Sequence, residues 1–214
     1  MPSIEDVRSY YPADDPVHGI SHVLRVYRLC ERIGKAEGAD LRILRAAALL
    51  HDIEGDVELR EGHQLAAAEF AAVLLEREGW DPDAIEAVAH CIRAHRFRDQ
   101  REQPSSLEAQ VLFDADKLDA IGAVGVARAV AYAVRAGMDV YAPPSPHFLR
   151  TGELAEGESQ TVAHEYLFKL RRIKDRLYTS TGRALAEDRH RLLEGFFQAW
   201  LKEIGDYSDH QVGG

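Results

Sequence analysis

The sequence predicts an all-α fold. Two observations lead to this prediction. Apolar residues recur at three- and four-residue intervals along most of the chain, which is the period of an amphipathic helix. No segment shows the alternating apolar and polar residues of a half-buried strand bounded by turn residues. The length of 214 residues and the hydrophobic content of 46% are sufficient for one substantial core.

The predicted helices follow one another along the chain. They span residues 17–33, 41–50, 64–78, 83–96, 107–118, 120–135, 162–177 and 183–204. In the first, apolar residues from Ile20 to Cys30 share one face, and Gly34 follows as the residue expected at a helix C-terminus. The second is almost continuous Ala and Leu, which is typical of a helix buried on most sides. This second helix is expected at the core.

The later helices have similar local signatures. The third is amphipathic, with apolar residues between Leu65 and Leu75. Pro82 stands at the first turn of the fourth, where proline is well tolerated. Gly122 and Gly125 allow the sixth helix to approach a neighbour closely. The last two predicted helices complete the chain.

We expect a single domain over residues 1–214. Its core spans about residues 14–137, a loop spans about 138–158, and further helices span about 159–205. The loop is predicted from the proline-rich run 142–146 and two nearby glycines. It is a candidate lid or an irregular connection.

Charge and composition exclude several classes of function. With 26 basic and 36 acidic residues the net charge is −10, which gives no footprint for nucleic acid. No apolar run reaches the ~18 residues of a membrane span, and the N-terminus lacks the regions of a signal peptide. Cys30 and Cys91 lie in apolar helical patterns without CxxC spacing, which predicts buried thiols. We therefore expect a cytoplasmic protein with no membrane partner.

The chemistry lies in the histidines and aspartates. The chain has 10 histidines, and the pair His51-Asp52 follows the apolar run from Ala46 to Leu50. An unpaired carboxylate at such a place would be costly to bury. Neighbouring residues on a helix point about 100° apart, so both can serve one cation only where the helix ends. Gly55 follows closely, as such an ending requires.

Asp116 presents the same problem of burial. It lies near the apolar face marked by Leu112 and Leu118, so its carboxylate needs a cation. A salt bridge to Lys117 or Arg128 is the purely structural alternative. Together with His22 and His51-Asp52, Asp116 makes a set of two histidines and two aspartates on three predicted helices. Such mixed nitrogen and oxygen ligands suit Mn, Co, Ni, Fe or Zn better than Ca.

These residues also carry a family resemblance. The segments His22-x-x-Arg25-Val26, Leu50-His51-Asp52 and Asp114-Ala115-Asp116-Lys117-Leu118-Asp119 resemble the HD superfamily of metal-dependent phosphohydrolases, whose signature is the order H…HD…D. The stretch DADKLDAIGAVGVAR is similar to small stand-alone bacterial HD proteins, a branch that includes nucleotide pyrophosphohydrolases. The tail segments 168–170, 173–175 and 183–189 are similar to that branch as well. The resemblance covers roughly residues 14–205 and implies a multi-helix HD-domain fold with additional C-terminal helices.

The resemblance implies a ligand set and a cofactor. His22, His51, Asp52 and Asp116 would be the metal ligands. The cofactor would be a divalent transition metal, with Mn²⁺ favoured and Mg²⁺, Co²⁺, Ni²⁺, Fe²⁺ or Zn²⁺ as alternatives.

Catalytic and substrate-binding roles are also carried over. Asp56 or Glu54 would position or deprotonate the attacking water, although Gly55 stands where some relatives have Glu. His18, four residues before His22, would orient that ligand or touch substrate, and packing on Tyr11 is its structural alternative. Residues expected to bind the substrate are Arg25, His90, His95, Lys117, Lys169 and Lys174. For the lysines near the C-terminus, a solvated basic face is the alternative.

Some HD branches hold a second metal. In this chain His63 and His90 are the candidates for such a site. His90 and His95 lie about 140° apart on a helix, so one cation is not expected to take both. We favour one essential metal with His90 and His95 lining the pocket.

The predicted function is hydrolysis of a nucleotide by metal-activated water. The family branch favours a (deoxy)nucleoside triphosphate or a related phosphoanhydride or phosphoester. One alternative is a diiron HD-type oxygenase, and the other is a non-catalytic nucleotide-sensing module. Substrate identity and the bond cleaved are beyond the sequence. Near the C-terminus, either a core or the face of a homodimer is expected to include Phe196, Phe197 and Trp200.

Overall fold

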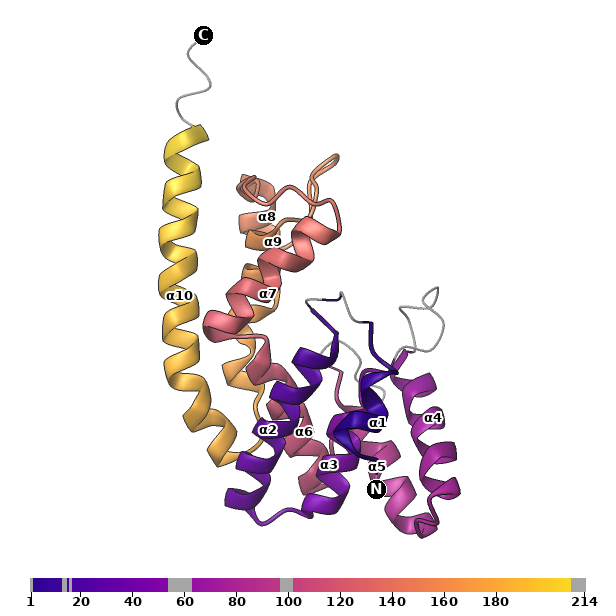
Figure 1. Cartoon of the computed structure of the whole chain (residues 1–214). Helices are drawn as coiled ribbons and strands as arrows, with labels where there is room; N and C mark the ends of the chain where they lie inside the picture. The colour runs from indigo at the N-terminus through magenta and orange to yellow at the C-terminus, as the bar shows by residue number, and fades with distance from the viewer. Residues whose placement is uncertain (1, 13–14, 16, 54–62, 97–101, 209–214) are drawn as a thin grey trace. The chain divides into compact units, whose positions relative to one another are not determined.

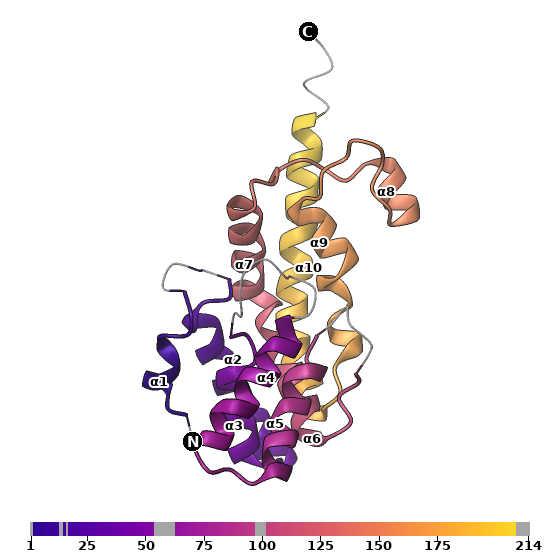
Figure 2. The same cartoon turned by 90° about the vertical axis from the view of Figure 1, so that its right-hand side faces the viewer.

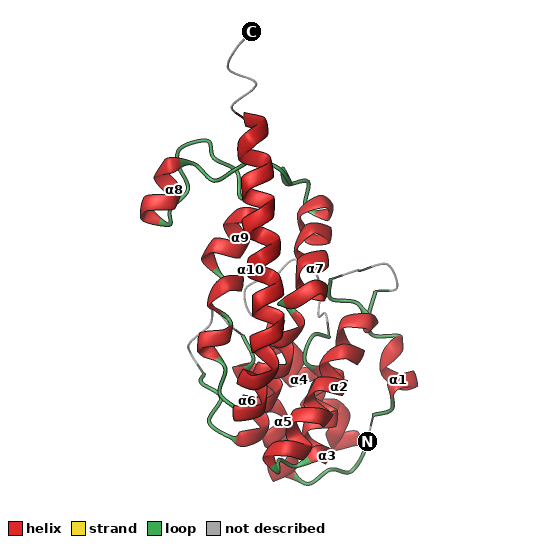
Figure 3. Ribbon diagram, turned by 90° about the vertical axis from the view of Figure 1, so that its left-hand side faces the viewer, coloured by secondary structure: helices red, strands yellow, loops and turns green. Residues whose placement is uncertain are grey.

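The structure is a computed structural model that describes residues 2–12, 15, 17–53, 63–96 and 102–208. Every regular element within these ranges is helical, as Figure 3 shows. The all-α prediction is therefore confirmed. Within the same ranges, none of the helices combines the length and the apolar character needed to cross a membrane.

The chain divides into two compact units, which we describe separately. Unit 1 comprises Met1–Asp119 and Leu177–Ala184, and unit 2 comprises Ala120–Arg176 and Leu185–Gly214. The last helix, α10 (Ser180–Ser208), begins in unit 1 and continues in unit 2. That the whole chain acts as one domain stays a prediction.

Unit 1 is built around α3. Besides the start of α10, its helices are α1 (Ile4–Arg8), α2 (Ile20–Glu37), α3 (Leu41–Leu50), α4 (His63–Arg77), α5 (Pro82–Ala94) and α6 (Leu107–Asp119). All five other complete helices contact α3, and α2 lies beside both α3 and α6 (Figure 1). Figure 2 shows α4 and α5, which also pack on each other. The Ala- and Leu-rich composition of α3 follows from this central place, because every residue from Ala46 to Leu50 is buried.

The first predicted helix extends beyond its expected end. Gly34 lies inside α2, and the helix ends at Gly38, whose φ of 80° is in the left-handed region. Gly34 is needed for packing instead: a Cβ there would lie 2.4 Å from Leu44 Cδ1 on α3. The glycine that looked like a cap therefore allows two core helices to approach, and the next glycine is the cap.

Two helix starts in unit 1 follow sequence rules closely. The Asp40 carboxylate accepts hydrogen bonds from the N–H groups of Arg42 and Ile43, at 2.7 and 3.4 Å, and begins α3. Asp81 caps α5 in the same way, with Pro82 as the first helical residue. The predicted place of Pro82 is confirmed.

A buried carboxylate ties residues 177–184 to α6. Asp114 is fully buried and accepts hydrogen bonds from Tyr178 N at 2.9 Å, Thr179 N at 2.8 Å and Thr179 Oγ1 at 2.6 Å. The Thr179 hydroxyl oxygen also accepts from Gly182 N at 2.9 Å. Asp114 thus holds Tyr178 and Thr179 before α10, and Thr179 in turn holds the first turn of that helix.

Unit 2 contains α7 (Gly122–Arg135), α8 (Pro146–Thr151), α9 (Val162–Phe168), the 3₁₀ turns η1 (Leu170–Arg172) and η2 (Lys174–Arg176), and most of α10. The helix predicted over 162–177 is wrong in its second half. The backbone leaves helical geometry at Lys169, with φ −121° and ψ −58°, and continues as the two 3₁₀ turns.

The segment predicted as a loop, 138–158, is more ordered than expected. It contains α8, and the carboxylate of Glu158 accepts hydrogen bonds from residues before and after this helix. Glu158 accepts from Ser145 N and Ser145 Oγ, both at 2.6 Å, and from Ala155 N at 2.8 Å. The ring of buried His164 on α9 lies 2.9 Å from the same carboxylate. This segment is an irregular connection with its own hydrogen-bond centre.

Aromatic side chains of α9 and α10 contribute to the core of unit 2. Phe197 on α10 is fully buried and stacks on Tyr166 of α9, with ring centroids 4.2 Å apart. Trp200 stacks on Tyr141 at 5.5 Å and contacts Phe196. Of the two roles predicted for the aromatic residues of this helix, Phe197 takes that of a core residue.

Candidate metal centre

The end of α3 presents two neighbouring side chains to one point. α3 ends at Leu50, His51 is its C-cap, and Asp52 follows in the turn. The helix thus ends where the geometry of a shared cation site requires it to end. His51 is fully buried, and the Asp52 side chain is 12% exposed.

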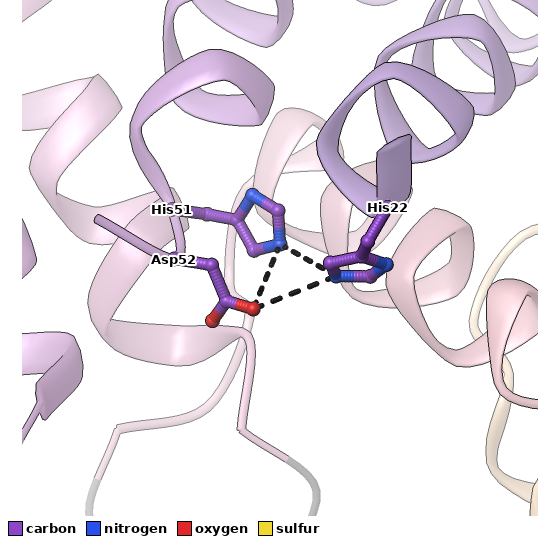
Figure 4. A group of neighbouring side chains, drawn as sticks. All are labelled: His22, His51 and Asp52. Carbon is purple, nitrogen blue, oxygen red and sulfur yellow. Dashed lines mark hydrogen bonds and ion pairs between the residues drawn. The ribbon is translucent and has the colours of Figure 1, made fainter. Parts of the chain in front are cut away.

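His22 meets this pair from the first turn of α2. Its Nε2 lies 3.4 Å from His51 Nε2 and 3.5 Å from Asp52 Oδ2. Asp52 Oδ2 is 3.9 Å from His51 Nε2. Figure 4 shows the three side chains pointing toward one another from two helices, and their ligand atoms are close enough to hold one ion.

Asp116 adds a fourth group from α6. Its Oδ1 lies 3.4 Å from His22 Nε2, and its Oδ2 forms an ion pair with Lys117 Nζ. The salt bridge to Lys117 considered as the structural alternative is therefore present. It occupies one carboxylate oxygen, while the other faces the histidine. Lys117 itself is 7% exposed and balances the charge of its neighbour.

The two histidines are held with their Nε2 atoms toward the centre. His51 Nδ1 lies 2.9 Å from the carbonyl oxygen of Ala48, and His22 Nδ1 lies 2.8 Å from Asp119 Oδ2. Both partners accept hydrogen bonds, so Nδ1 carries the proton in each neutral ring and Nε2 presents its lone pair. Outer carboxylates and carbonyls orient metal-binding histidines in this way.

The donor set fits a divalent cation. Two imidazole lone pairs and a carboxylate oxygen of Asp52 converge, and a carboxylate oxygen of Asp116 lies beside His22. Such a group of acceptors is unfavourable without a positive charge between them. The protonation states agree. Burial lowers the pKa of His51, which keeps its ring neutral. Burial acts to raise the pKa of Asp116, but the ammonium group of Lys117 opposes this effect, and that pKa lies well below the usual range.

His95 lies on the other side of Asp52. It follows the last residue of α5 and is 3% exposed. Its Nδ1 donates to the carbonyl oxygen of Ile92 at 2.6 Å, and its Nε2 lies 3.8 Å from Asp52 Oδ1. Burial lowers its pKa to about 3, so the ring is neutral near pH 7. The structure thus brings His95 to the centre.

His90 has different partners. Its Nδ1 lies 2.6 Å from Glu102 Oε1, and its Nε2 accepts from Ser105 N and Ser105 Oγ at 3.2 and 3.1 Å. Both ring nitrogens are therefore engaged in hydrogen bonds within the protein. A role of His90 in binding substrate or a second metal stays a prediction. His63 is the first residue of α4, and its side chain lies outside the description.

The remaining predicted residues are placed as follows. The His18 side chain is 45% exposed, with Nδ1 3.8 Å from Asp15 Oδ2 and its ring perpendicular to that of His22. Arg25 binds Asp119. Lys169, which pairs with Glu165 at 3.1 Å, and Lys174 belong to unit 2. Glu54 and Asp56 lie outside the described residues.

Sequence reasoning missed the role of Asp119. Its carboxylate is 1% exposed and contacts both His22 and Arg25. The available signal was its position, because it lies three residues after Asp116 on the same helical face. A second acid on the buried side of α6 needed a partner as much as the first.

Comparisons with known proteins agree with this centre. The HD domain family matches residues 19–121, a range that includes His22, His51, Asp52 and Asp116. The YpgQ protein of Bacillus subtilis is 35% identical over 201 residues, which are 92% of this chain and 90% of that protein.

Solved structures are similar over nearly the whole chain. The structure of Bacillus subtilis YpgQ in complex with ADP has a TM-score of 0.71 at 31% identity, and the match covers 94% of this chain and 98% of that one. A Lactobacillus plantarum protein has a TM-score of 0.75 at 30% identity, covering 94% and 93%. A predicted HD superfamily hydrolase from an uncultured Thermotogales bacterium has a TM-score of 0.62 at 32% identity, covering 94% and 90%.

Proposed function

The chain belongs to the HD-domain superfamily, and from this premise we propose that it is a metal-dependent phosphohydrolase that acts on a nucleotide. The family predicted from sequence is confirmed by the match to residues 19–121 and by the similarity to the predicted HD superfamily hydrolase from the Thermotogales bacterium. The observation that carries the proposal is the convergence of His22, His51 and Asp52 on one point, with Asp116 Oδ1 3.4 Å from His22 Nε2.

In this proposal those four residues hold the cation. When bound, a divalent cation polarises a phosphoryl oxygen and lowers the pKa of a coordinated water toward about 7. The chain's own residues prepare the site. Ala48 and Asp119 orient the two histidines, and Lys117 keeps Asp116 ionised. Mn²⁺ remains our preferred ion, because the donors mix nitrogen and oxygen.

His95 has a second role in this proposal. Its neutral ring lies beside Asp52 in a buried position, so it offers a polar wall next to the metal ligands. We propose that it contacts the substrate or the attacking water. The assignment of Asp56 or Glu54 as the base, and of Lys169 and Lys174 as phosphate contacts, stays a prediction.

The nucleotide part rests on a relative. The structure of YpgQ was determined in complex with ADP, and its similarity extends over 94% of the present chain. Together with the basic residues expected to bind phosphate, this supports a nucleotide substrate. A (deoxy)nucleoside triphosphate is the substrate we favour.

The alternatives gain less support. A diiron oxygenase of the kind considered above would use His90 as an iron ligand, and both nitrogens of His90 bind Glu102 and Ser105. A nucleotide sensor that has lost catalysis is expected to have lost a ligand, and all four are present.

The test is hydrolysis by metal-stripped protein. Nucleotides are supplied with Mn²⁺, Mg²⁺, Co²⁺ or Zn²⁺, and release of phosphate and pyrophosphate is measured. Activity is expected to require metal and to fall at least about 100-fold in Asp52→Asn and Asp116→Asn, which remove one ligand charge each. The control is Asp83→Asn, an exposed aspartate on α5, which is expected to retain activity. Metal-independent release, or full activity in both ligand variants, contradicts the proposal.

A further inference from the structure

Arg25 and His22 reach the same carboxylate. They lie one turn apart on α2, and Asp119 faces both from the end of α6. Asp119 Oδ2 lies 2.8 Å from His22 Nδ1, and it also accepts from the Arg25 terminal nitrogen at 3.0 Å. Asp119 Oδ1 accepts from Arg25 Nε at 2.6 Å.

This two-point contact fixes the plane of the carboxylate. A guanidinium presents its N–H groups as a rigid fork, so two parallel hydrogen bonds leave the carboxylate little freedom to rotate. The carboxylate also needs the opposite charge. Asp119 is 1% exposed, whereas the Arg25 side chain is 29% exposed. The guanidinium of Arg25 therefore reaches from the surface and neutralises the buried carboxylate.

The orientation of Asp119 decides what His22 can do. While Asp119 accepts the Nδ1 proton, the His22 lone pair stays on Nε2, the atom that faces His51 and Asp52. A rotated or displaced carboxylate would release the ring and allow the other tautomer. Arg25 therefore acts on the metal centre through two intervening side chains.

We propose that Arg25 is a positioning residue for the metal centre, and that it holds His22 in its ligating orientation through Asp119. The inference rests on the proposed function, because it assigns a role toward the bound cation. It gives Arg25 a role other than the substrate contact predicted for it, since Nε and one terminal nitrogen of the guanidinium donate to Asp119.

Metal affinity tests this inference without substrate. The dissociation constant of Mn²⁺ and Zn²⁺ is measured by competition with a chromogenic chelator for the full-length protein and for Arg25→Lys and Asp119→Asn. Arg25→Lys keeps the charge but removes the fork, and Asp119→Asn removes the charge but keeps the size. Each is expected to weaken binding about 10- to 100-fold, as loss of an outer partner of a metal ligand does.

The matched control is Arg28→Lys. Arg28 lies one further turn along α2 and is exposed, so this variant is expected to bind metal as the parent does. Circular dichroism and thermal unfolding without metal show whether each variant is folded. The absorption spectrum with Co²⁺ gives a second readout. It is expected to change in Arg25→Lys and Asp119→Asn and to stay the same in Arg28→Lys.

A double variant shows whether Arg25 acts through Asp119. Arg25→Ala is expected to add little further loss of metal affinity to Asp119→Ala, because the contact from Arg25 through Asp119 to His22 is already lost. Losses of metal affinity that multiply in the double variant would overturn the proposal that Arg25 acts through Asp119. Unchanged affinity with a raised KM in folded Arg25→Lys would overturn it in favour of substrate contact. Failure of the parent protein to bind any divalent cation would overturn the proposed function and, with it, this inference.

Discussion

Glu158 shows how a single side chain organises an irregular segment. The hydroxyl of Ser145, the N–H groups of Ala155 and Ser145, and the ring of His164 together lower its pKa from 4.5 to about 2. A carboxyl group with a lowered folded-state pKa stabilises the protein above its unfolded-state pKa. That contribution is lost as the pH falls from about 4.5 toward about 2.

Glu158→Gln is therefore expected to lower the unfolding temperature at pH 7 and to lose this effect in acid. Thermal unfolding followed by circular dichroism between pH 7 and pH 3 measures the difference. Glu156→Gln serves as the control, because Glu156 is exposed two residues earlier. A difference between Glu158→Gln and the parent that is the same at every pH would show that the carboxylate charge is not what Glu158 contributes.

The sequence predicted most of the side chains that meet at the candidate metal centre. His51 and Asp52 after an apolar helix, and Asp116 on an apolar face, were identified because a buried charge needs a partner. His90 and His95 were not distinguishable by that argument, since both lie in or near the same apolar stretch. The two histidines differ in their tertiary partners: His90 contacts Glu102 and Ser105, whereas His95 Nε2 lies near Asp52 after α3. No local sequence pattern specifies these contacts.

At the scale of helices, periodicity placed the elements well and glycine placed their ends poorly. Gly34 and Gly38 have the same side chain but different roles, one in packing and one in capping. No Gly or Pro marks the end of α9 after Phe168. The sequence therefore predicted one long helix where α9 and two 3₁₀ turns occur. Helix ends depend on tertiary contacts that the sequence pattern does not contain.

The start of α10 gives a direct test of such a contact. In Gly182→Ala, the new Cβ would lie 2.4 Å from Asp114 Oδ2 and 2.7 Å from Thr179 Oγ1. We expect a loss of about 1–3 kcal/mol in the free energy of unfolding, because overpacking displaces buried hydrogen-bonded groups. Chemical denaturation measures it.

Gly195→Ala is the control on the same helix. A Cβ at Gly195 meets no atom within 4 Å, so this substitution is expected to stabilise the protein by about 0.5–1 kcal/mol through helix propensity. Equal effects of the two substitutions would show that Asp114 and Thr179 move aside freely.

For the whole molecule, the question is how two compact units behave in one chain. All four proposed metal ligands belong to unit 1, while α10 runs without interruption from unit 1 into unit 2. A continuous helix cannot melt in one unit without losing its backbone hydrogen bonds at the junction. We therefore expect the chain to unfold in a single transition, as the single-domain interpretation predicts.

Calorimetry with and without Mn²⁺ tests this expectation. A ligand that binds only the folded state adds about 2.7 kcal/mol of stability at 100 times its dissociation constant. Mn²⁺ is thus expected to raise the midpoint of one common transition in the parent protein and to leave the midpoint of Asp52→Asn unchanged. Two transitions, of which Mn²⁺ moves one, would mean that unit 1 holds the cation as an independent domain and that α10 does not couple the units.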